Sequence, residues 1–257
     1  PAFARRCDAL GGFRLFVDLE RLGKAERQAG RNTFISEHTI DDVGRIRRVL
    51  TCSPLMVRVN PLHEGTRAEV DAAIGEGADM VMLPMFSQAQ QVRDFLGIVA
   101  GRVPAVTLLE TGAALDCLGE WIALPGLAEV YVGLNDLHLS LGHRFMFEPL
   151  ALGLVDRVAG AAKQQGVRFG FGGIARIDEG QLPGRDVLAE HLRLGSRSVI
   201  LSRTFHRAGE GDFEAEVAKL RNAERELAKR TPEQVGSDSQ RIAGVIQRIS
   251  AAVGPAR

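Results

Sequence analysis

Short apolar segments alternate with longer amphipathic segments along almost the whole chain. The apolar segments have the length of buried strands, and the segments between them repeat apolar residues every three or four positions, as helices do. The pattern predicts seven strands, at 12–19, 55–60, 79–84, 103–110, 128–134, 168–173 and 198–202. It predicts helices at 39–50, 67–77, 88–100, 112–124, 150–165 and 186–194. Strands and helices that alternate in this way form an α/β protein with a parallel sheet.

Individual residues mark the ends of several predicted helices. Thr39 precedes a helix with acids in its first turn, and Gly166 and Gly195 follow two others. The segment 212–253 reads as two helices separated at Thr231–Pro232. Because no linker or low-complexity tract interrupts the chain, we expect one domain over 1–257, with a C-terminal helical extension from about residue 212.

Seven strands are one fewer than a closed (β/α)8 TIM barrel contains. The chain opens with an amphipathic stretch at 2–10, which reads as a helix without its preceding strand. We therefore expect a (β/α)8 barrel whose first strand lies upstream of Pro1. An open or truly seven-stranded sheet is the alternative. An absent strand would leave two sheet edges unpaired, which favours association.

The composition narrows the classes of function. The chain has 32 Lys and Arg against 32 Asp and Glu, and no basic stripe with interleaved aromatic residues, so we expect no nucleic-acid partner. The longest apolar runs are only as long as strands, so we expect no membrane span. Cys7, Cys52 and Cys117 lack disulfide or zinc spacing, which is typical of a reducing cytoplasm. No signal peptide is visible, although a start at Pro1 leaves room for a native leader.

Two carboxylates stand at the ends of apolar runs. Glu110 ends the run at 103–110 and Asp136 ends the run at 129–136, about one strand–helix–strand unit later. Parallel barrels place their chemistry at these strand ends. Neighbouring carboxylates repel each other unless a cation or a shared proton intervenes, which favours a hard divalent metal. The alternatives are an acid at a helix N-terminus for Glu110 and a turn cap for Asp136.

Polar residues also follow other predicted strands. Asp18 and Glu20 flank Leu19, and Arg58 shares a strand face with Asn60. An arginine inside a strand can hold a carboxylate or an enolate oxygen. The alternative for Arg58 is a structural ion pair. Apolar residues around Pro84 could form the wall of a small substrate pocket.

Several motifs in this order resemble the HpcH/HpaI aldolase and citrate lyase β-subunit superfamily. They are Asp18-Leu19-Glu20 with Lys24 and Arg27, Val-Arg-Val-Asn-Pro at 57–61, Gly-Ala-Asp-Met-Val-Met-Leu-Pro at 77–84, Leu-Leu-Glu-Thr-Gly-Ala-Ala-Leu at 108–115, and the run at 124–142 that contains Gly-Leu-Asn-Asp-Leu. The resemblance covers about 13–142 and fades afterwards.

The resemblance implies a (β/α)8 barrel that binds Mg²⁺, Mn²⁺ or Co²⁺ through Glu110 and Asp136. Pyruvate or another 2-keto acid would chelate that metal, and Arg58 would hold the enolate oxygen. The substrate carboxylate would be received by the backbone of Gly133, Leu134 and Asn135. Such Lewis-acid catalysis needs no lysine Schiff base. Terminal helices of this family often pack on a neighbouring subunit, so we expect a homo-oligomer.

One position departs from the family pattern. Arg21 stands where the aldolase branch has its acid/base histidine, and arginine stays protonated near neutral pH. We expect Glu20 to move the proton by orienting metal-bound water, with Asp18 supporting the site through Arg21. Otherwise another histidine substitutes, and the candidates are His38, His63 and His138. We expect His138 on the same loop as Asp136.

Two features lie beyond the resemblance. The glycines at 169–173 could cradle a phosphate, or they could reflect close strand packing. Arg176 and Arg203 follow late strands and could contact a distal anion of the substrate or form surface ion pairs.

Three functional hypotheses remain. The leading one is a class II type, metal-dependent aldolase or lyase that acts through a pyruvate enolate, with an aldehyde as co-substrate. The second is a lyase similar to the citrate lyase β-subunit that acts on an acyl-thioester. The third is a catalytically silent barrel that serves as a scaffold or ligand binder.

Overall fold

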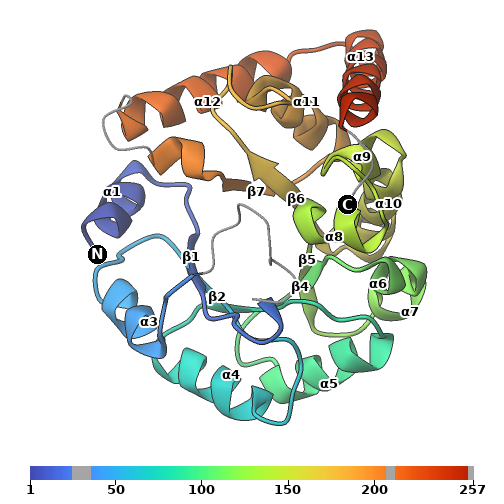
Figure 1. Cartoon of the computed structure of the whole chain (residues 1–257). Coiled ribbons are helices and arrows are strands. Elements are labelled where there is room, and N and C mark those ends of the chain that lie inside the picture. Colours follow the sequence, from blue (N-terminus) through green and yellow to red (C-terminus); the bar gives the residue numbers. More distant parts are fainter. Residues whose placement is uncertain (25–35, 207–211, 254–257) are drawn as a thin grey trace. The chain divides into compact units, whose positions relative to one another are not determined.

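The structure, a computed structural model, describes residues 1–24, 36–206 and 212–253 (Figure 1). Its strands are β1 (Leu15–Asp18), β2 (Leu55–Arg58), β3 (Met80–Leu83), β4 (Ala105–Leu109), β5 (Leu127–Val132), β6 (Arg168–Ile174) and β7 (Ser198–Leu201). The first helices are α1 (Ala2–Leu10), α3 (Ile40–Arg47), α4 (Thr66–Gly75), α5 (Ala89–Val99), α6 (Gly112–Asp116) and α7 (Leu118–Trp121). The later ones are α8 (Leu134–Ser140), α9 (Glu148–Ala151), α10 (Leu154–Gln165), α11 (Gly184–Leu194), the 3₁₀ turn η1 (Arg203–His206), α12 (Phe213–Leu227) and α13 (Pro232–Ala252). The predicted α/β alternation and all seven predicted strands are confirmed.

The chain divides into two compact units. The first contains Pro1–Leu109 and Asp116–Glu129, and the second contains Glu110–Leu115 and Val130–Arg257. Each unit is described by itself below. Our expectation of one domain over 1–257 stays a prediction.

The first unit is built on parallel strands in chain order, β1 to β4. Asp18 at the end of β1 lies opposite Arg58 at the end of β2, and Arg58 lies opposite Met82 of β3. Strands β3 and β4 are buried along their whole length, as expected when helices cover both faces of a parallel sheet. The side chains at the carboxyl ends of β1 and β2 therefore gather at one edge of a rigid, buried sheet.

The second unit contains the parallel pair β6 and β7 and the terminal helices. The β6–β7 ladder shifts register between Gly170 and Gly173, which is a bulge. Helices α12 and α13 pack against α11, and α13 also packs against α9 (Figure 1). The predicted break between the last two helices is confirmed, because the Thr231 side chain caps α13 and Pro232 is its first residue.

Several sequence-based boundaries are wrong. The predicted helix at 112–124 is two short helices, α6 and α7, and the one at 150–165 is interrupted at Gly153 between α9 and α10. The strand expected at 128–134, with Asp136 at its carboxyl end, ends at Val132, and Asp136 lies in the first turn of α8. The buried positions of α8 follow the helical spacing of three or four residues, which the apolar run had concealed.

Two further findings bear on the class of protein. Within the described ranges, no helix is long and apolar enough to cross a membrane. Cys7, Cys52 and Cys117 are all free thiols. The cytoplasmic location stays a prediction.

Candidate active site

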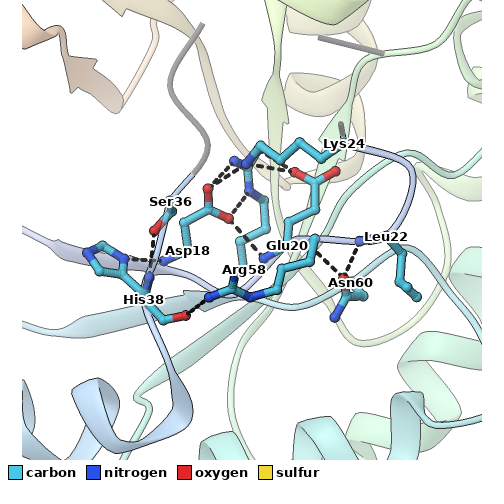
Figure 2. Close-up of polar contacts among 9 residues, drawn as sticks. Asp18, Glu20, Leu22, Lys24, Ser36, His38, Arg58 and Asn60 are labelled. Atoms are coloured by element: carbon cyan, nitrogen blue, oxygen red, sulfur yellow. Dashed lines mark hydrogen bonds and ion pairs between the residues drawn. The ribbon is translucent and has the colours of Figure 1, made fainter. Parts of the chain in front are cut away.

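The central contact of the first unit joins the ends of β1 and β2. The Arg58 guanidinium donates from Nε to Asp18 Oδ1 at 2.9 Å and from Nη2 to Asp18 Oδ2 at 2.7 Å (Figure 2). Asp18 is 8% exposed, so this two-point ion pair is largely withdrawn from water. Of the two sequence interpretations of Arg58, the geometry shows the ion pair, and the enolate contact stays a prediction.

Glu20 and Lys24 complete a cluster of two acids and two bases with this pair. Lys24 Nζ lies 2.6 Å from Asp18 Oδ2 and 3.4 Å from Glu20 Oε2. Arg58 Nη1 also lies 3.4 Å from Glu20 Oε2, and Glu20 is 1% exposed. Two buried carboxylates are therefore balanced by the buried Lys24 and the half-buried Arg58, which is the condition for keeping charges in a protein interior. We name Asp18, Glu20, Lys24 and Arg58 the charge cluster.

The pKa of Asp18 reflects this environment. Burial alone would raise it, but the hydrogen bonds and charges of Arg58 and Lys24 outweigh burial and lower the pKa from 3.8 to about 2. Asp18 is thus ionised at any pH near neutrality. It is a permanent anchor for the two cations rather than a group that exchanges protons.

The loop that carries Glu20 is held by Asn60, just after β2. Asn60 Oδ1 accepts hydrogen bonds from the backbone N–H groups of Arg21 (2.8 Å) and Leu22 (2.9 Å). Its amide group in turn donates to Glu69 Oε1, which fixes the orientation of the amide. Sequence reasoning placed Asn60 on the face of Arg58 but missed this role, because a contact across the loop has no sequence signal.

Among the described residues Arg21 makes no direct contact with Asp18, and its side chain binds the carbonyl of His38, whose ring accepts the Asp18 N–H, so support of Asp18 by Arg21 stays a prediction. The Arg21 backbone N–H donates to Asn60 Oδ1, its carbonyl accepts the Lys24 N–H at 3.2 Å, and its Nη2 donates to the His38 carbonyl at 3.0 Å. The reason for this placement is the loop geometry, because Asn60 draws the Arg21 backbone inward and leaves the side chain exposed. Lys24, which sequence reasoning noted only as a motif residue, takes the place beside Asp18. Its spacing of four from Glu20 was the available signal.

His38 is the candidate histidine that reaches the charge cluster. Its Nδ1 accepts a hydrogen bond from the backbone N–H of Asp18 at 3.1 Å, and its ring is exposed (Figure 2). His63 instead contacts Glu69, with Nε2 at 3.3 Å from Glu69 Oε2. Of these two, only His38 makes contact with a member of the cluster.

Glu110 and Asp136 belong to the second unit. Glu110 directly follows β4 and is 3% exposed, and Asp136 is half-buried in α8. The N–H of Gly112 donates to Ser140 Oγ at 2.9 Å. Because Ser140 lies one helical turn after Asp136, the helix face that bears Asp136 is the one turned toward the Glu110–Gly112 segment.

The residues around Asp136 have different positions from those expected. Gly133 is the residue before α8, and Leu134 and Asn135 are its first two residues, whose N–H groups lack an intrahelical acceptor. His138 lies in α8 and not on a loop. It is buried, with Nδ1 at 3.1 Å from the Leu134 carbonyl oxygen. Its catalytic role stays a prediction.

Glu110 and Asp136 fit a hard divalent cation in donor chemistry. Among the residues that the structure describes, no group of three or more His, Cys, Asp and Glu side chains could hold a metal ion. Magnesium sites commonly use one or two carboxylates and leave other positions to water and substrate. Two carboxylates that follow neighbouring strands of the chain match that pattern, whereas a structural zinc site would need more protein ligands.

Three other features that the sequence singled out have less direct links to the site. Pro84 directly follows β3 and is buried, and its substrate contact stays a prediction. The glycines at 169–173 lie within β6, and a Cβ at Gly170 would come within 2.8 Å of the Tyr131 ring. Close packing thus accounts for that glycine without a phosphate. Arg27, the last residue of the Asp-Leu-Glu motif, lies outside the described residues.

A parallel α/β protein whose acids and bases gather where strands end has the construction of barrel enzymes. A sequence model of HpcH/HpaI aldolase/citrate lyase matches residues 15–174, more than half of the chain. The chain belongs to this family.

Three relatives illustrate the similarity. The chain is 34% identical over 98 residues to a (3S)-malyl-CoA thioesterase of Cereibacter sphaeroides, a match that covers 38% of this chain and only 34% of that relative. The citrate lyase beta subunit of M. tuberculosis, complexed with oxaloacetate and magnesium, has a TM-score of 0.56 and 18% identity over 88% of this chain and 92% of that one. Protein CitE from Mycobacterium tuberculosis, in complex with magnesium and pyruvate, has a TM-score of 0.57 and 17% identity over 93% of this chain and 90% of that one. At these identities the two structures show a shared fold.

Proposed function

We propose that this chain is a divalent-metal-dependent carbon–carbon lyase or aldolase, built as a (β/α)8 barrel, that acts through the enolate of pyruvate or a similar 2-keto acid. The observation that carries the proposal is the charge cluster at the ends of β1 and β2, in which an arginine is held rigidly between two buried carboxylates. Family membership and the magnesium-bound structural neighbours support it.

In the first unit, the role of the cluster is to hold Arg58 in one orientation. A guanidinium fixed on two sides by Asp18 and Glu20 loses little freedom when it receives an oxygen that becomes negative. Pro84 forms part of the apolar wall around the substrate. Asp18 keeps its charge throughout, because its pKa is about 2.

In the second unit, Glu110 and Asp136 hold Mg²⁺ or Mn²⁺. The metal supplies Lewis-acid stabilisation of the charge that develops on the substrate. The N–H groups of Gly133, just before α8, and of Leu134 and Asn135, its first two residues, receive the substrate carboxylate.

His38 is the proposed proton carrier in place of the family histidine that Arg21 replaces. Because Nδ1 accepts the Asp18 N–H, the neutral ring carries its proton on Nε2 and can exchange it with substrate or water. Glu20, placed 3.4 Å from both Lys24 and Arg58, is the alternative carrier. His38→Gln separates the two: loss of proton exchange at unchanged metal affinity supports His38, and retained exchange favours Glu20.

The second candidate function is chemistry on an acyl-thioester. It is favoured by the matched malyl-CoA thioesterase and by the Asp18-Leu19-Glu20 opening with Lys24. In either case we propose a cytoplasmic homo-oligomer that associates through its terminal helices, α12 and α13. Light scattering of the wild type and of a chain truncated before α13 tests that association.

Hydrogen exchange on pyruvate tests the leading proposal without a choice of acceptor. The protein is incubated with pyruvate and Mn²⁺ or Mg²⁺ in D₂O, and loss of the methyl proton signal is followed by NMR. We expect exchange that a chelator, Glu110→Gln and Asp136→Asn each abolish. Asp116→Asn, at an exposed carboxylate of α6, is the matched control and keeps exchange. Mn²⁺ affinity measured by electron paramagnetic resonance provides a readout apart from activity, and the first two substitutions should weaken it.

Two outcomes would redirect the assignment. Mn²⁺ binding at Glu110 and Asp136 with thioester cleavage, but without methyl exchange, would favour the acyl-thioester function. Metal binding with neither activity would favour a catalytically silent ligand binder.

A further inference from the structure

Arg176, two residues after β6, is a buried cation with unmet hydrogen-bonding capacity. It is 8% exposed, and its Nε and Nη2 are buried without a hydrogen-bond partner among the residues that the structure describes. Its remaining nitrogen, Nη1, lies 3.6 Å from Glu179 Oε1, which is a long ion-pair contact. Two of the three guanidinium nitrogens thus have no acceptor within residues 1–24, 36–206 and 212–253.

Two hydroxyl groups follow the neighbouring strand, β7, at the same edge of the sheet. The backbone N–H of Arg176 donates to Thr204 Oγ1 at 3.1 Å. Thr204 Oγ1 in turn lies 2.9 Å from Ser202 Oγ. Within this hydroxyl pair one group donates to the other, so one hydroxyl proton remains for a further acceptor. Because β6 and β7 are parallel neighbours, these side chains lie at one edge of the sheet.

A buried guanidinium without acceptors is costly, and an apolar residue of similar size would usually be as stable or more stable in its place. The arrangement becomes favourable when an anion supplies the missing acceptors. The planar guanidinium matches the oxygens of a carboxylate or a phosphate in particular. The position also fits, since α/β barrels often bind anions at the ends of their last two strands.

We propose that Arg176, with Ser202 and Thr204, binds an anionic group of the substrate, either a carboxylate or a phosphate. This subsite deepens the proposed function and rests on it for the rest of the substrate. It assigns the enzyme a substrate with an anionic group in addition to the 2-keto acid carboxylate that α8 receives. Glu179 is the internal competitor for Arg176, and its side chain, 33% exposed, is the part of this contact that can move aside.

Calorimetric titration with inorganic phosphate and with succinate, each alone at fixed ionic strength, tests the subsite. Neither metal nor keto acid is present, so failure here is separate from failure of the exchange experiment. We expect Arg176→Met to weaken anion affinity roughly tenfold or more, because charge-assisted hydrogen bonds are lost. Arg197→Met removes an exposed positive charge just before β7, at the opposite end of that strand, and is the matched control, with a change of about twofold or less. Glu179→Gln removes the competing carboxylate and should tighten binding.

The two probes distinguish the sources of the anion. Tighter binding of phosphate indicates a phosphorylated group, and tighter binding of succinate indicates a carboxylate. Melting temperature without anion supplies a second readout. Arg176→Met should melt no lower than the wild type and should lose the rise in melting temperature that the anion produces. Equal anion affinity in Arg176→Met and wild type would overturn the proposal. So would a wild type that binds neither probe, or an Arg176→Met protein that is folded but strongly destabilised.

Discussion

Asp18 and Arg58 lie directly opposite each other in β1 and β2 and share two parallel hydrogen bonds, of 2.9 and 2.7 Å. Their pairing sets the geometry of the charge cluster, because Asp18 is also the closest partner of Lys24. Removal of the carboxylate charge would leave the buried Lys24 and the half-buried Arg58 with Glu20 as their remaining partner in the cluster.

Asp18→Asn is therefore expected to lower the free energy of unfolding by about 3 kcal/mol, as is typical when one partner of a buried ion pair is lost. Urea denaturation measures the change. Asp94→Asn, at an exposed carboxylate of α5, should change stability by less than about 0.5 kcal/mol. If Asp18→Asn lowered the free energy of unfolding as little as this control does, the cluster would be held by packing and not by charge.

The same carboxylate predicts a pH dependence. Its pKa is about 2 in the folded chain against an ordinary 3.8, so its stabilising effect is complete above pH 3.8 and is lost as the pH falls from 3.8 toward 2. From pH 5 to pH 3 the stability difference between wild type and Asp18→Asn should narrow by about 1 kcal/mol. Urea curves at the two pH values measure it. A difference that stays constant would contradict the low pKa.

The strand and helix order could be predicted from sequence because each element carries its own local signal. Gly166 and Gly195 end α10 and α11 in the left-handed conformation, as their positions after an apolar periodicity indicate. Asp136 was misplaced because Gly133 and Leu134 continue an apolar run that strands and helices share. Neither the length of this apolar run nor its content of β-branched residues distinguished a strand from a helix there.

The candidate site was predictable only where a residue was unusual for its element. Arg58 stood out as a charge inside a strand. Lys24 and Asn60 did not, because their roles depend on how the loop after β1 folds back over β2. Arg176 was noted by position, but its unmet hydrogen bonds exist only in the folded chain.

His191 predicts a second, separate pH effect. Its ring stacks on Phe171 at 3.8 Å, and burial lowers its pKa from 6.5 to about 3. Below pH 6.5 the His191 ring binds a proton in the unfolded chain but stays neutral in the folded chain. The free energy of unfolding therefore falls as the pH falls through 6.5. Between pH 7 and pH 5 we expect a loss of about 2 kcal/mol.

Urea curves of wild type and His191→Phe at the two pH values measure this effect. The substitution should remove the pH dependence over this interval. Ser196→Ala removes the hydroxyl next to Nδ1 but keeps the histidine, and should retain the dependence. A His191→Phe protein as acid-sensitive as the wild type would place the titrating group elsewhere.

Tyr131, the single tyrosine of the chain, forms hydrogen bonds with the backbone of β6 and of β7 at the bulge between them. Its hydroxyl accepts the Ile200 N–H at 2.9 Å and donates to the carbonyl groups of Gly172 or Phe171. The hydroxyl thus joins backbone groups of both strands beside the register shift. Tyr131→Phe removes the hydroxyl and should cost about 1–3 kcal/mol, because the Ile200 N–H loses its acceptor.

Thr107→Val is the matched control for that substitution. Thr107 is fully buried in β4 and its hydroxyl has no hydrogen-bond partner in the part of the chain that the structure describes, so its removal should leave stability unchanged or slightly raised. Urea denaturation compares the two variants, and hydrogen exchange reports protection of the Ile200 amide. Loss of that protection in Tyr131→Phe alone is expected, because the stabilising effect depends on the partner and not on burial of a hydroxyl. Equal effects of the two substitutions would show that the bulge does not need Tyr131.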